Sequence, residues 1–212
     1  LAGLTLALQL KLRDPGSDVL VLERNRHPVP EAAFKVGEST VECGAHYFAD
    51  VLGLREHLER EQLAKFGLRY FFNHRSDAID RCTELGVGRG LPTGSFQLDR
   101  GRFENFLGGH VRARGVDFRD AAKVLKVDMG GEGAPHRVEY AGDDGTRIVT
   151  ARWIVDASGR VGLLKRKFGL AEANGHDATA AWWRVDGRLD INDWSDDPGW
   201  RARCTPPDRW RS

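Results

Sequence analysis

The first 23 residues hold the feature that most restricts the fold: a helix, a turn, a buried strand and an acid, in that order. Leucine and alanine dominate residues 2–13, as in a helix buried on most sides. Residues 14–17, Asp-Pro-Gly-Ser, end that helix, and residues 19–22, Val-Leu-Val-Leu, are typical of a covered parallel strand. Glu23 closes the strand. This order predicts the second half of a βαβ unit, and we expect its first strand to precede Leu1.

The spacing between Gly3 and Glu23 is typical of dinucleotide binding. In the G-x-G-x-x-G fingerprint, the last glycine lets the helix pack closely on the strand. An acid about 20 residues later accepts hydrogen bonds from the adenosine ribose. Glu23 follows Gly3 by 20 residues, with the required elements between them. The alternative is an ordinary helix glycine and an ordinary strand-end carboxylate.

A second signal lies far along the chain, where Trp153–Val155 is predicted as a buried strand. It runs into the sequence Asp-Ala-Ser-Gly at 156–159. Small residues allow a backbone to approach a cofactor without a side-chain clash. A long β-rich insertion separates the two signals, an arrangement found in two-domain flavoproteins and rare in simple nicotinamide-binding folds. Together the two signals favour a flavin-binding domain.

Between these signals the sequence predicts alternating helices and strands. Thr40 is the expected N-cap of a helix that ends near Leu52, where Gly53 stops it. The other predicted elements are helices over 54–62 and 103–115, strands over 67–72, 96–98, 124–127, 138–140 and 148–149, and a hairpin turn over 142–145. Five of the six tryptophans lie from Trp182 onward, where they could line an aromatic cavity or pack on a sheet.

Composition and charge exclude several classes of protein. The formal net charge of +1 argues against a broad electrostatic surface for nucleic acid or a membrane. The longest apolar stretch, residues 1–10, is about half a membrane span. The three cysteines and seven histidines lack disulfide-framework or metal-ligand spacings, so we expect no metal site. A reducing, cytoplasmic setting is the default for such a chain.

Three further motifs follow the first unit in a recognisable order. They are K-V-G-E-S-T at 35–40, D-R-G-R-F-E-N-F-L at 99–107 and W-I-V-D-A-S-G at 153–159. With Gly3 and Glu23, they make the chain resemble the N-terminal part of flavin-dependent halogenases of the tryptophan-halogenase type, within the FAD-dependent monooxygenases. The resemblance covers essentially the whole chain. The K-V-G-E-S-T segment, so close to the first unit, favours the halogenase branch.

This resemblance implies an α/β fold: an FAD-binding Rossmann-like βαβ domain with a β-rich substrate-domain insertion, truncated at both ends. The FAD-binding domain would comprise residues 1–60 and 100–175, and the substrate-binding part would begin with 61–99 and 176–212. Reduced FAD, supplied by a separate flavin reductase, would activate dioxygen, and the activated oxygen would oxidise the halide. The substrate would be a small aromatic molecule, free or carrier-bound. The cofactor performs the oxidation, and the protein supplies orientation and exclusion of water.

The resemblance also implies cofactor contacts for five residues. Gly3 would be the last glycine of the phosphate-binding loop, and Glu23 would be the ribose ligand. Arg100 would reach the cofactor. Asp156 and Gly159 would line its adenosine side.

A strap along the flavin would be formed by Val36, Gly37, Glu38 and Ser39. Halogenases also use an active-site lysine beyond the strap, after a helical segment and before a strand, and Lys65 occupies that place. A lysine suits this role because its ammonium can donate a hydrogen bond to the oxidant, or its neutral amine can be chlorinated. The alternative is a solvated lysine at a helix end, where the helix dipole favours a positive charge.

Other functions stay open on the sequence alone. The same fold could serve an aromatic hydroxylase, in which oxygen is transferred to the substrate, or a geranylgeranyl-reductase-like enzyme acting on isoprenoid double bonds. The chain could also be a nucleotide-binding module without catalysis. The Trp-x-Trp-x-Ile-Pro signature of halogenases, expected shortly after Ser212, would separate halogenation from hydroxylation.

Overall fold

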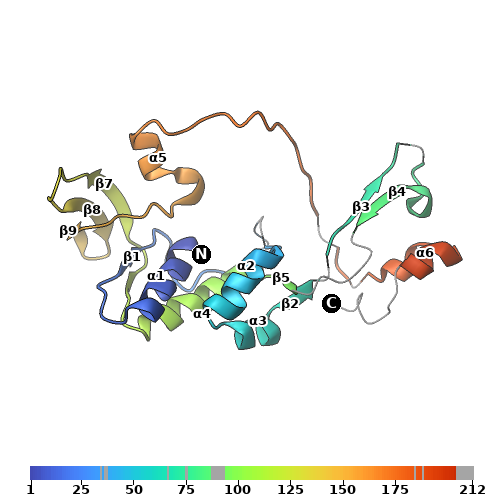
Figure 1. The fold of residues 1–212 in the computed structure, drawn as a ribbon, viewed down its shortest axis with the longest axis horizontal. Helices are drawn as coiled ribbons and strands as arrows, with labels where there is room; N and C mark the ends of the chain where they lie inside the picture. The colour runs from blue at the N-terminus through green and yellow to red at the C-terminus, as the bar shows by residue number, and fades with distance from the viewer. Residues whose placement is uncertain are drawn as a thin grey trace.

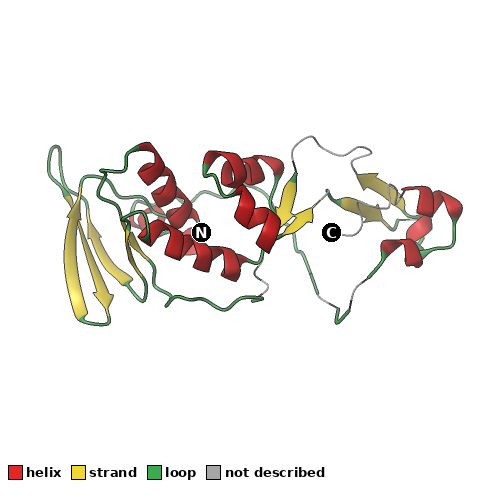
Figure 2. Cartoon of the chain, turned by 90° about the horizontal axis from the view of Figure 1, so that it is seen from below, coloured by secondary structure: helices red, strands yellow, loops and turns green. Residues whose placement is uncertain are grey.

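The computed structural model describes residues 1–33, 35, 38–65, 67–74, 76–86, 94–183, 185–187 and 189–203. Within them the α-helices are α1 (Ala2–Arg13), α2 (Glu42–His46), α3 (Arg55–Glu61), α4 (Arg100–Arg112), α5 (Leu163–Lys167) and α6 (Pro198–Arg203). The strands are β1 (Leu20–Leu22), β2 (Leu63–Lys65), β3 (Arg69–Phe72), β4 (Thr83–Gly86), β5 (Ser95–Gln97), β6 (Asp117–Arg119), β7 (Lys123–Asp128), β8 (His136–Gly142) and β9 (Gly145–Ala151). Figures 1 and 2 show a helical middle between the β7–β9 sheet and the β3–β4 hairpin.

The core lies where α1 and α4 pack against each other beside a pair of parallel strands. β1 pairs in parallel with β6, with Leu20 opposite Asp117. α1 contacts both α4 and β1, as Figure 1 shows. Burial of apolar side chains from all four elements stabilises this arrangement, and they include Leu4, Ala7, Leu8, Phe103, Leu107, Val111 and Phe118.

α1 forms as predicted, but it is less buried than the leucine pattern indicates. Leu10 and Leu12 are exposed, whereas the lysine between them is buried. Lys11 Nζ donates hydrogen bonds to the carbonyl oxygens of Pro15 and Ser17 at 3.1 and 2.7 Å. The Lys11 ammonium therefore stabilises the turn between α1 and β1. Hydrophobic periodicity alone does not predict this role for a lysine.

The region from Thr40 to Glu61 is helical, with one correction to its start. Val41, and not Thr40, is the N-cap of α2, which passes into a π-helical turn at Tyr47–Val51. Gly53 stops the helix as predicted, with φ +68°. The Thr40 hydroxyl is unavailable as a cap because it is buried, donating to the carbonyl of Phe96 at 3.0 Å and accepting from its N–H at 2.8 Å.

Residues 38–40 lie along β5, on the edge opposite β2. β2 and β5 pair antiparallel, with Lys65 opposite Ser95. On the other edge, Leu98 N–H donates to the Glu38 carbonyl at 2.8 Å, and Ser39 forms a bridge with Gln97. The backbone of the predicted strap is thus held at a defined place beside the core.

The β3–β4 hairpin and the segment around α6 form a second packed unit. Trp200 of α6 is fully buried and donates from its indole nitrogen to the Ile191 carbonyl at 2.9 Å. The Arg69 guanidinium lies 5.2 Å from the ring centre of Phe71 and 4.8 Å from that of Trp200. Figures 1 and 2 show α6 beside this hairpin. Of the two roles open to the tryptophans, Trp200 therefore has the packing role.

β7, β8 and β9 form an antiparallel meander with the predicted turn between Gly142 and Gly145. Its buried Tyr140 hydroxyl accepts a hydrogen bond from Arg119 at the end of β6. Arg26, in the loop after β1, forms an ion pair with Asp143 in the β8–β9 turn at 2.7 Å. These contacts join the meander to the parallel pair.

The prediction of a buried strand at Trp153–Val155 is wrong. The segment has no strand conformation, and Trp153 and Val155 are 85% and 65% exposed. An apolar run becomes a strand only when a neighbouring backbone pairs with it, and no described residue does so here. After it come a 3₁₀ turn (Gly159–Val161) and α5. No helix in the described part of the chain is both long and apolar enough to cross a bilayer.

Candidate functional site

The start of α1 lies against β1 and against the loop that follows residue 155. A methyl group placed on Gly3 would lie 3.5 Å from Ala157 Cβ and 3.9 Å from Val21 Cγ1, both ordinary van der Waals distances. The two sequence signals, far apart in the chain, therefore meet at the first turn of one helix.

The N-terminus of α1 is suited to an anion. No side chain caps it, and its first turn holds no acidic residue. Helix N-termini present free N–H groups and a partial positive charge, so they bind phosphates. Nearby, Glu23 continues the pairing of β1 through its N–H, which donates to the Arg119 carbonyl at 2.9 Å. Its Oε1 accepts from Asn25 N–H at 2.8 Å, which orients the carboxylate at the strand end.

Asp156 shapes the loop beside α1. Its Oδ1 accepts from Ser158 N–H at 3.0 Å and its Oδ2 accepts from Leu164 N–H, in the first turn of α5, at 2.8 Å. Burial would raise the pKa of Asp156, but hydrogen bonds from Ser158 and the α5 backbone outweigh it and leave the pKa below its ordinary value. Gly159 has φ +62° and open space above its Cα. The carboxylate thus fixes the loop, and the glycine backbone is the part open to a ligand.

Arg100 and Lys35 converge on Glu104, close to the start of α1. Arg100 Nε donates to Glu104 Oε1 at 3.1 Å, and Lys35 Nζ lies 3.6 Å from Oε2. The backbone nitrogen of Leu1 is 3.7 Å from Oε1. The Glu104 carboxylate is largely buried, and the side chains that pair with it are Arg100 and Lys35. Two basic side chains therefore stand near the start of α1.

Lys65 is the last residue of β2, so it lies within a strand, whereas the sequence predicted that it lies between a helix and the next strand. Its half-buried ammonium donates to the carbonyl oxygen of Thr40 at 2.6 Å. This places Lys65 at the end of the strap rather than in solvent. Of the strap residues, Glu38 Oε1 accepts from Lys35 N–H at 3.2 Å and Ser39 pairs with Gln97, whereas Val36 and Gly37 lie outside the described residues.

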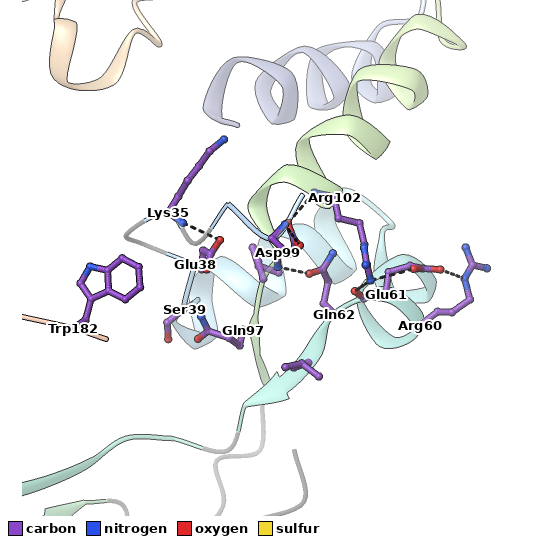
Figure 3. Close-up of a pocket in the computed structure, with 13 residues that line it drawn as sticks. Lys35, Glu38, Ser39, Arg60, Glu61, Gln62, Gln97, Asp99, Arg102 and Trp182 are labelled. Carbon is purple, nitrogen blue, oxygen red and sulfur yellow. Dashed lines mark hydrogen bonds and ion pairs between the residues drawn. The ribbon is translucent and has the colours of Figure 1, made fainter. Parts of the chain in front are cut away.

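A groove of about 800 Å³ runs beside the strap (Figure 3). Figure 3 shows Trp182, on a separate segment of chain, next to the side of the groove formed by Glu38 and Ser39. The arginines in the groove are paired with acids, Arg60 with Glu61 at 2.9 Å and Arg102 with Glu31 at 3.2 Å. The remaining lining is mainly uncharged and includes Ala32, Ser39, Gln62, Leu63, Gln97, Leu98 and Trp182.

Comparison with known proteins identifies the family of this chain. Residues 1–205 match the family described as FAD binding domain. The chain belongs to this FAD-binding family. This confirms the predicted cofactor, FAD, and the mixed helix and strand class of the fold.

Relatives of this FAD-binding domain include flavin-dependent halogenases, as the sequence resemblance predicted. The flavin-dependent halogenase chlA of Dictyostelium discoideum is 31% identical over 182 residues, which cover 76% of this chain and 30% of that protein. The myxobacterial chondrochloren halogenase CndH is 30% identical, with a TM-score of 0.60 over 74% of this chain and 34% of its own. The chain thus spans about a third of the length of these relatives.

A third similar structure is the halogenase PltM in complex with phloroglucinol and FAD. It is 20% identical, with a TM-score of 0.61 over 82% of this chain and 35% of its own. At this identity the likeness concerns the fold alone.

The residues of the FAD-binding domain fit its cofactor. An uncapped helix N-terminus suits the pyrophosphate, a strand-end carboxylate suits ribose hydroxyls, and a glycine allows close packing at the first turn. Sequence reasoning missed Gln62 and Gln97 of the groove, and it gave Trp182 only as one of several tryptophans that could line an aromatic cavity. Only the adjacent tryptophans 182 and 183 offered a signal, and they did not indicate which of the two faces a cavity.

Proposed function

We propose that this chain is the FAD-binding part of a flavin-dependent halogenase that acts on a small aromatic substrate. The observation that carries the proposal is the half-buried Lys65 ammonium, bound to the Thr40 carbonyl at the end of the strap. Sequence identity of about 30% to two halogenases supports the same conclusion. An ordinary surface lysine would point its charge into water instead.

In this proposal α1 and β1 belong to a Rossmann-like βαβ unit. The start of α1 would hold the pyrophosphate of FAD, Glu23 would bind its ribose, and Gly159 would line its adenosine side. Arg100 lies within reach of the phosphates because it stands on the same side of Glu104 as the α1 start. The parallel pairing of β1 with β6 supports this layout.

We assign residues 1–60 and 100–175 to the FAD-binding domain, and 61–99 and 176–212 to the start of a substrate-binding part inserted into it. Contacts between the two segments of the second part support this division. Besides the packing of Trp200 on Arg69, the Ser195 hydroxyl donates to Asp80 Oδ2 at 2.5 Å. β2 and β5, which pair beside the strap, form the junction.

When bound, reduced FAD would reduce dioxygen by two electrons to the peroxide level, and that oxidant would take two electrons from a halide. The chain's own residues bind, orient and shield. An ammonium has three N–H donors, and the Thr40 carbonyl takes one of those on Lys65, so others can hold the oxidised halogen and direct it toward the substrate. The strap backbone, paired with β5, fixes the distance between this lysine and the flavin.

The groove supplies a binding place for an aromatic ring with hydroxyl groups. Trp182 offers a flat apolar face, and Ser39 and Gln97 offer hydrogen-bond donors and acceptors (Figure 3). Phloroglucinol, the ligand of the PltM structure, has this chemistry and is a suitable probe.

Replacement of Trp182 by alanine should raise KM for phloroglucinol about 2- to 10-fold, with little change in kcat, because a ring contact contributes about 0.5–1.5 kcal/mol. Steady-state kinetics on the full-length protein measure this. The neighbouring Trp183, which is 79% exposed and does not line the groove, is the matched control. Equal effects of the two substitutions would exclude a stacking role for Trp182.

Mass spectrometry of the product tests the proposed reaction. The full-length protein is given reduced FAD, dioxygen, bromide and phloroglucinol, with the flavin reduced chemically or by an added reductase. The proposal predicts a product that has exchanged hydrogen for bromine, recognisable by its paired isotope peaks. A product that has gained only an oxygen atom would instead identify a hydroxylase, the alternative that shares this fold.

A further inference from the structure

A buried polar link joins α3 to the start of α4. His57 and Gln62 are only 6% and 8% exposed. Gln62 Oε1 accepts a hydrogen bond from Asp99 N–H at 2.7 Å, and Gln62 Nε2 lies 3.3 Å from His57 Nε2. Leaving a buried polar group without a hydrogen bond costs free energy, so both ends of this link must be paired. The donor and the acceptor of each hydrogen bond can therefore be deduced.

The bond to Asp99 fixes the protonation of His57. A backbone N–H can only donate, so the oxygen of the Gln62 amide must face Asp99. Its NH₂ group therefore faces the imidazole, and His57 Nε2 must be the unprotonated acceptor. His57 is thus neutral with its proton on Nδ1. In the imidazolium form two donors would face each other and the link would be lost.

Asp99 connects this link to the segment that leads into the strap. Its Oδ1 accepts from Arg102 N–H at 3.0 Å, which caps α4, and its Oδ2 accepts from Ala32 N–H at 2.7 Å. Ala32 has φ +50°, a conformation that needs such support in a residue other than glycine. A methyl group on Gly101 would lie 2.1 Å from the Pro30 carbonyl oxygen, so this segment rests directly on the helix start.

The surroundings of His57 favour its neutral form. Its ring stacks on Phe106 and Phe103 of α4, with centroids 3.8 and 5.5 Å away. Burial lowers the pKa of His57 and is the largest influence. Glu61 opposes this shift, whereas the positive charges of Arg60 on α3 and of Arg102 and His110 on α4 reinforce it.

We propose that Gln62 is a positioning residue for residues 30–32, the segment that leads toward the strap, holding Asp99 in place only while His57 is neutral, so that acidification releases this segment. The inference concerns the scaffold and holds whichever reaction the flavin performs. Because the folded protein disfavours the charged imidazole, the stabilisation is complete above the pKa of an unfolded histidine, about 6.5. It is lost as pH falls below that value toward the lower folded-state pKa.

Two spectroscopic measurements on the full-length protein test this without relying on bound FAD. Nitrogen NMR of ¹⁵N-histidine-labelled protein should show His57 with an unprotonated Nε2 at about pH 8. The hydrogen-exchange protection factor of the Asp99 amide should fall at least about 10-fold between about pH 8 and pH 5, as this histidine titrates. An Nε2-protonated neutral tautomer, or protection that does not follow the titration, would overturn the proposal.

Gln62→Glu should abolish the expected pH dependence. Its carboxylate can accept from both Asp99 N–H and a protonated His57, so His57 should titrate at higher pH and the Asp99 amide should stay protected near pH 5. His110→Gln is the control, because His110 stacks on Phe106 but does not contact Gln62. The Kd for FAD should weaken on acidification in the unmodified protein and in the control, but not in Gln62→Glu. A Kd that stays constant while the Asp99 amide opens would refute the positioning role.

Discussion

Replacing Lys65 by alanine in the full-length protein should reduce halogen incorporation by about 10²–10⁴-fold, as expected for loss of a group that donates to the reacting species. FAD binding should be retained, because residues 38–40 of the strap region pair with β5 without help from Lys65. The other contacts assigned to FAD come from Arg100, the start of α1, Glu23 and the loop at 156–162. The Lys65 side chain instead lies at the end of the strap, on Thr40. The expected loss is therefore in turnover rather than in cofactor content.

Lys126→Ala is the matched control for this substitution. Lys126 is also a strand lysine with a hydrogen-bonded ammonium, 2.8 Å from Asp128, but it lies on the exposed β7. Exposed pairs of this kind contribute little to stability, so activity should be unchanged. Flavin absorbance measures FAD content, and mass spectrometry measures halogenated product. Undiminished product from Lys65→Ala would remove this residue from the mechanism.

Gly3→Val should weaken FAD binding about 10-fold or more, because overpacking of a close contact costs about 1–3 kcal/mol. The first side-chain carbon has room, at 3.5 Å from Ala157 Cβ. Valine adds two γ-carbons beyond that position, and they would push the helix start away from β1 or from Ala157. Either movement misplaces the amides that we assign to the pyrophosphate.

Gly3→Ala is the matched control, and it should bind FAD nearly as well as the unmodified protein. Its methyl group meets ordinary van der Waals distances only, and alanine favours the helix by about 1 kcal/mol over glycine. Titration of flavin fluorescence gives both Kd values. If valine and alanine bound FAD equally well, the close approach at Gly3 would have no part in the cradle.

Local signals explain which parts of the fold could be predicted from the sequence. The helix, turn and strand before Glu23 each have their own determinants: apolar periodicity, a Pro-Gly break and an apolar run. Gly53 stops its helix through a positive φ that other residues rarely adopt. The proximity of Gly3 to Ala157 was predictable because two motifs of one binding site must meet at one ligand.

Non-local pairing explains the parts that could not be predicted. Trp153–Val155 has the composition of a strand, but strand formation depends on a partner that the segment itself does not specify. Thr40 looks like a helix cap, yet the backbone of Phe96 takes its hydroxyl. Lys65 is in a strand because β5 pairs with residues that follow α3 directly. The link between His57 and Gln62 has no signature in the sequence.

We propose that FAD binds where the start of α1, the end of β1 and the loop at 156–162 meet. Hydrogen exchange of the full-length protein, with and without FAD, tests it most directly. We predict increased protection in residues 2–6, around Glu23 and over 156–162, with none in the β3–β4 hairpin. Unchanged exchange at both the α1 start and residues 156–162, in protein that holds FAD, would contradict the account.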